Sequence, residues 1–323
     1  MKKVITLGLF GITSLFSQTL FNTHAKVFSY EQNLQRKHID QMRFDSDYAW
    51  RGWGFLNLGV RNNFIGETES AIDALPQIGF DRSYPLSNGE LLMGVDLNGG
   101  GGRLAGGENV ASFAGYGLGG YMLYRTQSEC YLSLSFKMAQ IFQNIYNQWI
   151  YNTMWLFDLG VGKRFNFEWG YFIETNMHFG MGVISDSHLK FMQDGERIKL
   201  DSQSNLPFNF LGVFSIGKQI GKHQVKTSIS PKLDIYAKGK IFEETARALR
   251  IDKPKAHFDL LLSITYDMKI RDNAHFFTYA DFHSLQFEMM MGAGIRVEFG
   301  ENKYTPLKYP KIKLNKLKKT YLK

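Results

Sequence analysis

Serine and histidine residues in the C-terminal third of the chain are the first candidates for chemistry. A serine hydrolase needs a nucleophile and a base within hydrogen-bonding reach, and a third group that orients the base. The nominal candidates are Ser263, His257, His275, His283 and Ser284. His283 and Ser284 are adjacent in a strand-like segment, so their side chains point to opposite faces, and no recognised hydrolase motif surrounds either one. We therefore expect no enzymatic activity.

Metal and cofactor binding also find little support. Cys130 is the only cysteine, which excludes an internal disulfide and a cysteine-rich metal cluster. The run Gly99 to Gly102, followed by Arg103, could suggest a phosphate-cradling loop, but no helix and no Lys-Ser/Thr pair follow it. We interpret this run as a mobile surface loop, and we expect neither a cofactor nor a bound metal.

The formal charge of +8 is confined to the two ends of the chain. The first residues carry Lys2 and Lys3, and the tail from Gly300 to Lys323 carries eight lysines and one glutamate. The body between these ends is therefore nearly neutral, which argues against nucleic acid as a partner. The tail itself is either a solvated end or a segment that binds anionic polymer or lipid.

The N-terminus has the features of a secretory signal. Lys2 and Lys3 precede an apolar run from Val4 to Phe16, and Thr23-His24-Ala25 offers small residues for cleavage after Ala25. The apolar run is too short for a membrane-spanning helix, which needs ~20 residues. We therefore expect residues 1–25 to direct export and to be removed.

Long segments of alternating polarity dominate the remaining chain. From Ala256 to Met268, apolar residues at even positions alternate with mostly polar residues at odd positions. Such a period of two predicts a strand with one apolar and one polar face, and its length exceeds the usual ~5–6 residues. Strands of this kind are typical of a transmembrane β-barrel, which meets lipid outside and water inside.

Twelve such strands can be placed along the chain. We predict them at about 50–62, 74–84, 90–100, 112–126, 129–142, 151–166, 169–184, 206–219, 222–238, 255–270, 273–284 and 289–299. Tight turns such as 126–128 alternate with long connections such as 185–205 and 239–254. This alternation is typical of periplasmic turns and extracellular loops, so we predict an all-β fold: a twelve-stranded antiparallel barrel.

Aromatic residues gather near both ends of one predicted hairpin. The two groups are Tyr146, Trp149, Tyr151 and Trp155, and Phe165, Phe167, Trp169, Tyr171 and Phe172. We interpret them as the two interfacial girdles of a membrane barrel. The alternative is the aromatic core of a soluble β-sandwich.

A short helix is predicted before the first strand. Ser29 and Gln32 form a capping-box pattern, and apolar residues follow at helical spacing as far as about Phe44. The helix carries Arg36, Lys37 and Arg43. It either lies in the periplasm or enters the barrel as a plug.

Glycines on the polar faces of several strands bear on this choice. The candidate lumen residues are Gly115, Gly117, Gly119, Asp158, Gly160, Gly162, Glu174, Gly180, Gly182, Gly292, Gly294, Arg296 and Glu298. These bare strips would make room for a helix, and the acidic residues could pair with its basic side chains. Alternatively, the glycines relieve strain in a strongly curved sheet.

Together these segments resemble the autotransporter β-domain, the translocator unit of type V secretion. The similarity covers Ser29 to Phe299 and rests on the order of four runs: 49–53, 117–121, 155–165 and 292–299. The resemblance implies a monomeric barrel in the outer membrane, with a helix through its pore. Gly294, Val297 and Phe299 resemble the signal by which the barrel assembly machinery recognises outer-membrane barrels.

The chain departs from that family in two ways. Only Lys26 to Phe28 separate the expected cleavage site from the helix, so we expect no passenger in cis, and the chain continues beyond Phe299. We divide it into a signal (1–25), a helix and linker (26–48), a barrel (49–299) and a basic tail (300–323). Expected partners are outer-membrane lipid and lipopolysaccharide, the assembly machinery, and a host surface or a separate passenger. An open porin-like channel and an adhesin acting through its loops remain alternatives.

Overall fold

The computed structural model describes most of the chain between residues 28 and 301. The described residues are 28, 31–40, 48–62, 69–106, 109–145, 148–185, 187–193, 196–202, 206–237, 239–243, 249–251, 255–284 and 288–301. The expected signal segment, Tyr146, Arg43 and the tail beyond Glu301 lie outside them. Among the described residues, no helix is long and apolar enough to span a membrane.

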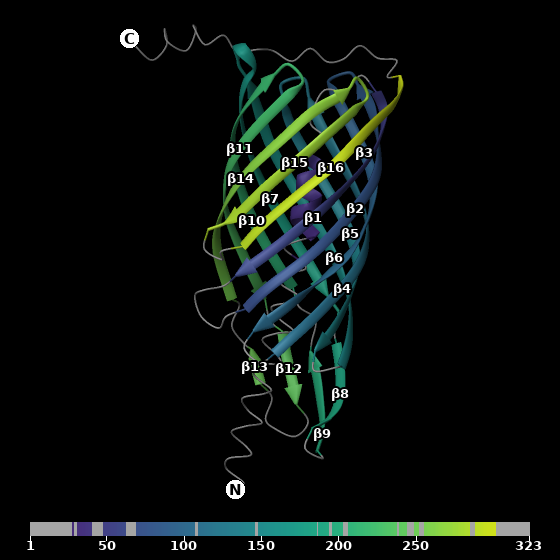
Figure 1. Cartoon of the computed structure of the whole chain (residues 1–323), viewed down its shortest axis with the longest axis vertical. Helices are drawn as coiled ribbons and strands as arrows, with labels where there is room; N and C mark the ends of the chain where they lie inside the picture. Colours follow the sequence, from purple (N-terminus) through teal and green to yellow (C-terminus); the bar gives the residue numbers. More distant parts are fainter. Residues whose placement is uncertain are drawn as a thin grey trace, which may run out of the picture.

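Twelve antiparallel strands close into a barrel, as predicted (Figure 1). In chain order they are β1 (Tyr48–Asn62), β2 (Glu69–Leu86), β3 (Gly89–Gly106), β4 (Asn109–Thr126), β5 (Cys130–Ile145), β6 (Gln148–Asn166), β7 (Tyr171–Ile184), β10 (Leu206–Ile220), β11 (His223–Ala237), β14 (Lys255–Arg271), β15 (Ala274–His283) and β16 (Glu288–Glu301). A one-turn 3-10 helix, Glu168–Gly170, joins β6 to β7. Pairing of β1 with β16, for example Trp50 with Phe299, closes the sheet and removes its free edges.

The strands alternate between outside and inside as their sequence predicts. In β14, Phe258 is 57% exposed and Leu262 is 44% exposed on the outer surface, whereas Asp259 and Ser263 are buried. Because successive side chains of a strand point to opposite faces, the odd residues of β14 line the lumen. The polar side of the sheet is therefore its inner side, which is the reverse of a water-soluble fold.

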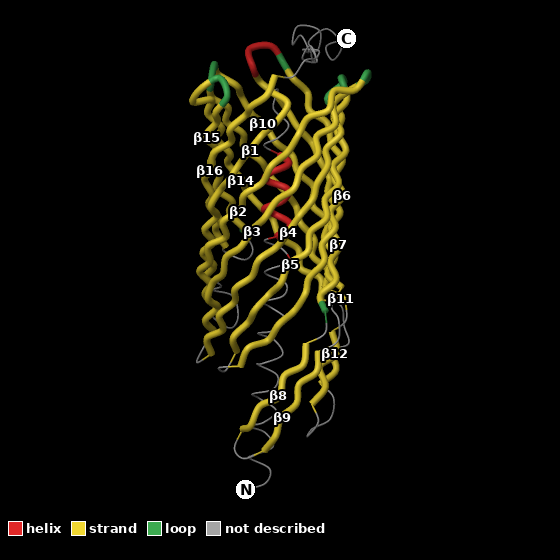
Figure 2. The backbone as a smooth tube through the Cα atoms, turned by 90° about the vertical axis from the view of Figure 1, so that its right-hand side faces the viewer, coloured by secondary structure: helices red, strands yellow, loops and turns green. Residues whose placement is uncertain are grey.

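The two ends of the barrel differ in their connections (Figure 2). The turns after β2, β4, β6, β10 and β14 are short and lie at one end, here the short-turn end; the other connections lie at the long-connection end. Several predicted loops are wrong in extent, because β3 reaches Gly106 and β4 begins at Asn109. The interpretation of Gly99 to Arg103 as a surface loop is also wrong, since the β4 ladder satisfies this backbone, with Gly102 opposite Phe113.

A second, small sheet projects beyond the long-connection end of the barrel (Figure 2). It contains β8 (Ser187–Gln193), β9 (Glu196–Ser202), β12 (Gly239–Glu243) and β13 (Leu249–Ile251), in the order β13-β12-β9-β8. The sequence predicted plain loops here. Pairing of β9 with β12 joins two connections that are distant in the chain, so local patterns did not reveal it.

The structure places part of each predicted aromatic girdle on the outer surface of the barrel. Trp149 and Tyr151 face outward at one end of the β6–β7 hairpin, and Trp169 and Tyr171 are exposed at the other. Phe172 is wrongly assigned to a girdle, because it is 1% exposed and lies inside the barrel. Its position follows from strand parity, since Tyr171 takes the outer face.

Candidate functional site in the barrel lumen

A helix lies inside the barrel and is enclosed by its wall (Figures 1 and 2). Residues 31–40, here called the lumen helix, are helical and are all buried or half-buried. Leu34 and Ile39 are 0% and 1% exposed, and they pack in one cluster with wall side chains such as Phe55 and Leu75. The helix precedes β1 in the chain, so the part of the chain inside the barrel comes before the first strand.

Two basic side chains of the lumen helix bind acidic side chains of the wall. Arg36 donates from Nε to Asp158 Oδ2 over 2.9 Å, and its Nη2 bonds Asp158 and also Asn209, the latter over 2.7 Å. Lys37 Nζ lies 2.6 Å from Asp281 Oδ1 and 3.3 Å from Ser263 Oγ. The structure thus brings two of the three predicted plug residues to carboxylates.

Acidic residues of the lumen helix bind basic wall residues, which the sequence reasoning missed. Glu31 Oε2 lies 2.9 Å from Lys137 Nζ, and Lys137 is in turn 3.1 Å from Asp96. Asp40 Oδ2 lies 3.7 Å from Lys226. The available signal was strand parity, because Lys137 has the same parity as Ser133 and Ser135 of β5 and therefore continues their polar, lumen-facing side. Buried pairs of both polarities therefore hold the helix in a fixed rotation.

A third cluster surrounds His38, which is fully buried. Its imidazole stacks on the Trp53 indole with ring centroids 3.5 Å apart, and its Nε2 lies 2.6 Å from the Tyr121 hydroxyl. That hydroxyl donates to Asp81 over 2.9 Å and accepts from Trp53 Nε1 over 3.1 Å. His38 is thus joined to β1, β2 and β4 at once.

The lumen glycines make room in two different ways. A side chain at Gly180 would collide with the Gln32 amide, and one at Gly182 would meet the Phe28 ring, so these two glycines directly accommodate the N-terminal segment. At Gly115 an added Cβ would meet the Gln140 backbone carbonyl, and at the other positions the space is taken by lumen side chains of neighbouring strands. Those positions are Gly117 (facing Asn98), Gly119 (Asp96), Gly160 (Ser133 and His178), Gly162 (Tyr131), Gly292 (Tyr279) and Gly294 (Phe55).

The remaining predicted lumen charges have partners in the wall. Arg296 Nε lies 3.2 Å from Glu298 Oε1, and Arg296 Nη2 lies 3.8 Å from Asp267. Glu174 accepts a hydrogen bond from Asn176 over 3.4 Å. On β16, Val297 and Phe299 face outward and are each 43% exposed, whereas Gly294 faces inward against Phe55.

The serine and histidine candidates are distributed over separate contacts. Ser263 accepts from Lys37, His283 Nδ1 lies 2.6 Å from Asp259, and His275 Nδ1 lies 2.9 Å from Asp267. The Ser284 backbone N–H donates to Leu260, and the side chain of His257 lies outside the described part of the chain. Within that part, no group of three or more His, Cys, Asp or Glu residues is arranged to hold a metal ion.

These features define a class of structure: a closed twelve-stranded barrel with a helix inside it. Comparison with solved structures finds the same fold in autotransporter β-domains. The β-domain of the Bordetella autotransporter BrkA aligns with a TM-score of 0.61 at 15% identity, over 78% of this chain and 100% of that one. The translocator domain of NalP from Neisseria meningitidis gives 0.62 at 11% identity, over 85% of this chain and 98% of that one.

A third similar structure is the transport unit of the autotransporter AIDA-I from Escherichia coli. It aligns with a TM-score of 0.57 at 9% identity, over 78% of this chain and 90% of that one. No protein-family model and no curated protein sequence matches the chain. At these identities the likeness establishes the fold: this chain is built as an outer-membrane-type barrel of the autotransporter translocator architecture.

Proposed function

We propose that this protein is an integral outer-membrane barrel of the translocator type whose pore is closed by its own lumen helix. The supporting observation is the set of buried ion pairs between helix and wall, above all Arg36 with Asp158 and Glu31 with Lys137. The apolar outer surface supports residence in lipid, because the lipid-facing band of such barrels is apolar. The protein acts as a structural or translocator unit of the membrane and not as an enzyme.

The width of the barrel supports a closed pore. Barrels of ~8 strands are filled by side chains, and those of 16–18 strands hold an aqueous channel. Twelve strands fall between these limits, and a helix with its side chains is ~10 Å across. The helix and the charged side chains that meet it therefore occupy the space that an open channel would need.

A second function is favoured by the small sheet at the long-connection end. If the short turns are periplasmic, as is usual for such barrels, β8, β9, β12 and β13 project from the cell surface. An ordered sheet presents a defined surface to other molecules, which would suit adhesion. This role is compatible with a closed pore.

Conductance in planar bilayers tests the closure. The mature chain from Lys26 should conduct poorly, and deletion of residues 29–40 should raise the conductance strongly. A second variant, Gly180→Met, places a side chain where the Gln32 amide lies and should open the pore without removing the helix. The control is Gly212→Met on the outer face of β10, where the nearest atom, of Pro231, is 3.5 Å from an added Cβ.

A large and steady conductance of the unmodified protein, unchanged by the deletion, would contradict the proposal. That result would favour the open diffusion channel. It would also mean that the buried pairs of the lumen helix do not hold it in the membrane-inserted protein.

A further inference from the structure

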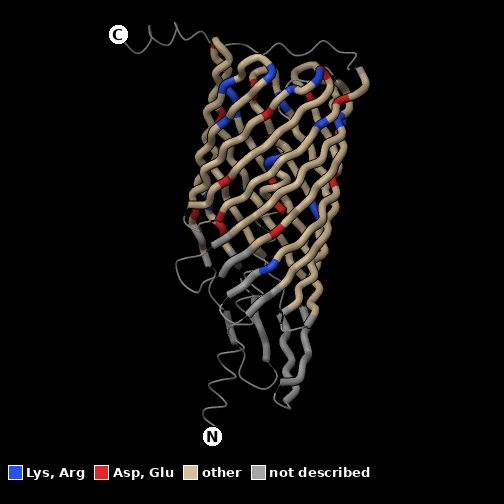
Figure 3. Tube along the Cα trace, viewed as in Figure 1, with Lys and Arg blue, Asp and Glu red and all other residues tan. Residues whose placement is uncertain are grey.

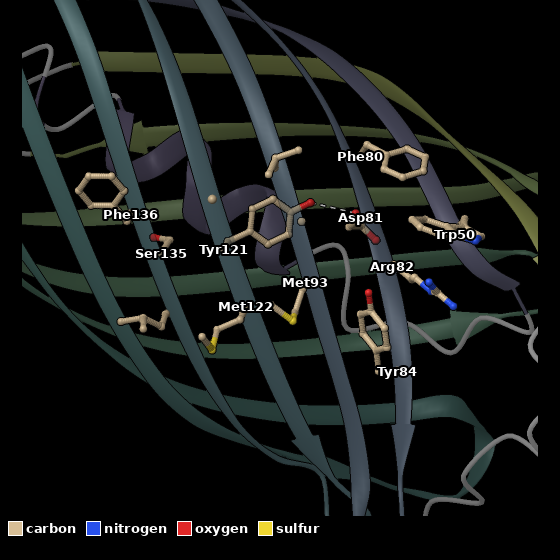
Figure 4. Close-up of a pocket in the computed structure, with 14 residues that line it drawn as sticks. Trp50, Phe80, Asp81, Arg82, Tyr84, Met93, Tyr121, Met122, Ser135 and Phe136 are labelled. Carbon is tan, nitrogen blue, oxygen red and sulfur yellow. Dashed lines mark hydrogen bonds between the residues drawn. The ribbon is translucent and has the colours of Figure 1, made fainter.

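The outer wall of the barrel carries a groove that the proposed function does not use. It is a hollow of about 460 Å³ that crosses β1 to β5, and its outward-facing lining includes Trp50, Phe80, Arg82, Met93, Met122 and Phe136 (Figure 4). The lining side chains that face outward are almost all apolar. Phe80, Met93, Met122 and Phe136 are 38–45% exposed.

The groove exists because of one outward-facing glycine. Gly120 lies on β4 between the exposed residues Leu118 and Met122, and opposite Val95 of β3. An added Cβ at Gly120 would have room, because the nearest atom, the Gly94 carbonyl oxygen, lies 3.8 Å from it. The missing side chain therefore leaves a depression between the large outward side chains of Met93, Met122 and Phe136.

An arginine lies on the outer surface at one side of this depression. The Arg82 guanidinium lies 4.5 Å from the centroid of the Trp50 ring and 4.9 Å from that of the Tyr84 ring (Figure 4). Arg82 is exposed, and its contacts within the described residues are these aromatic faces rather than a carboxylate. Stacking holds the guanidinium plane in place and leaves its N–H donors available to an anion.

The height of Arg82 on the barrel indicates which part of a lipid it meets. Arg82 is four residues before the end of β2 at Leu86, which at ~3.4 Å per residue and a tilt of ~40° is roughly 10 Å from the turn. Basic positions are frequent towards this end of the barrel (Figure 3). Trp and Tyr rings mark the headgroup level of membranes, so Trp50 and Tyr84 place Arg82 at the boundary between headgroup and acyl chain.

We propose that this groove binds an anionic glycerophospholipid of the periplasmic leaflet. The phosphate takes the Arg82 guanidinium, which matches its geometry with two parallel hydrogen bonds. One acyl chain lies in the depression over Gly120, between Met93, Met122 and Phe136. The choice of leaflet rests on the proposed outer-membrane function, whereas the lipid chemistry rests on the groove alone.

Native mass spectrometry of the purified full-length mature protein in a nonionic detergent tests this site. Dimyristoyl phosphatidylglycerol should be retained about fivefold over the phosphatidylethanolamine with the same chains, because one arginine near an anionic lipid contributes ~1 kcal/mol. Arg82→Gln should abolish that preference. Gly120→Leu should lower retention of both lipids, since it fills the groove.

Two matched variants serve as controls. Lys218→Gln removes another outer-face cation at the same end, one that lies 4.3 Å from the Tyr171 ring. Gly212→Leu fills an outward glycine on β10, away from the groove. Both should bind lipid like the unmodified protein, and a heat-dependent shift in gel mobility should show that every variant is folded.

Equal retention of the two lipids by the unmodified protein would overturn the proposal, and so would a Gly120→Leu protein that retains lipid normally. If Gly120→Leu fails to fold, Arg82→Gln still tests the proposal, because it alters an exposed side chain. Because the measurement is made in detergent, it is independent of localisation and pore closure. Fractionation of the protein away from the outer membrane would refute the proposed function while a measured lipid preference would stand.

Discussion

Loss of the Arg36 charge should release the lumen helix from the barrel wall. The Arg36–Asp158 pair is separated by 2.9 Å and its side chains are 5% and 3% exposed. At an effective dielectric constant of ~20, this distance corresponds to an attraction of about 6 kcal/mol. Dehydration of the two charges offsets part of it, and removal of one partner from a buried pair typically costs ~3–5 kcal/mol.

The lower end of that range applies to Arg36→Gln. When the helix leaves, Asp158 faces the water-filled lumen and keeps the bond from His178 Nδ1 at 2.9 Å. A loss of ~3 kcal/mol changes the ratio of closed to open barrels by roughly 100-fold, since each 1.4 kcal/mol is a factor of ten. Single-channel recording in planar bilayers should therefore show a large rise in open probability.

The double variant Arg36→Gln/Asp158→Asn distinguishes loss of this ion pair from general destabilisation of the barrel. It leaves no unpaired charge and allows an amide to bond an amide, so its open probability should be lower than that of Arg36→Gln alone. An Arg36→Gln protein that stays closed like the unmodified one would refute the reasoning. So would a double variant whose effect equals the sum of the two single changes, because independent sites add.

Two further predictions concern the lipid face and the topology. Leu262→Arg should destabilise the barrel by roughly 2–4 kcal/mol near the midplane, whereas Leu262→Met, which keeps the outer face apolar, should cost much less; urea unfolding in lipid vesicles measures both, and equal losses would mean that Leu262 does not face lipid. A tag inserted in 185–205 should be labelled on intact cells, and a tag in 126–128 should not be, because the long connections face outward. Surface labelling of the second tag would reverse the orientation.

The strands could be predicted closely because their determinants are local. The segment predicted as 206–219 is β10, Leu206–Ile220, and the one predicted as 255–270 is β14, Lys255–Arg271. In a membrane barrel, each residue faces either lipid or lumen according to its parity, so the alternation records the environment directly. The ends of the strands were less predictable, since pairing carries β3 through a glycine-rich run to Gly106.

The sequence could predict the charge of the groups that bind the lumen helix, but not which residues they are. Basic residues on the helix and carboxylates on the polar faces suggested attraction, but Arg36 and Asp158 are 122 positions apart in the chain. Which carboxylate meets which base depends on the rotation of the helix and on the shear of the closed sheet. The Glu31–Lys137 pair, with the opposite polarity, was missed for the same reason.

The sequence by itself determined the twelve strands, the side of each that faces lipid, and the presence of a helix before β1, because alternation and helical spacing act between neighbours in the chain. Only the tertiary structure decided that the helix lies in the lumen and that Gln32 occupies the space beside Gly180. It also decided that β9 pairs with β12 and that a groove at Gly120 lies beside Arg82. These features depend on closure of the sheet, which brings residues distant in the chain within a few ångströms of one another.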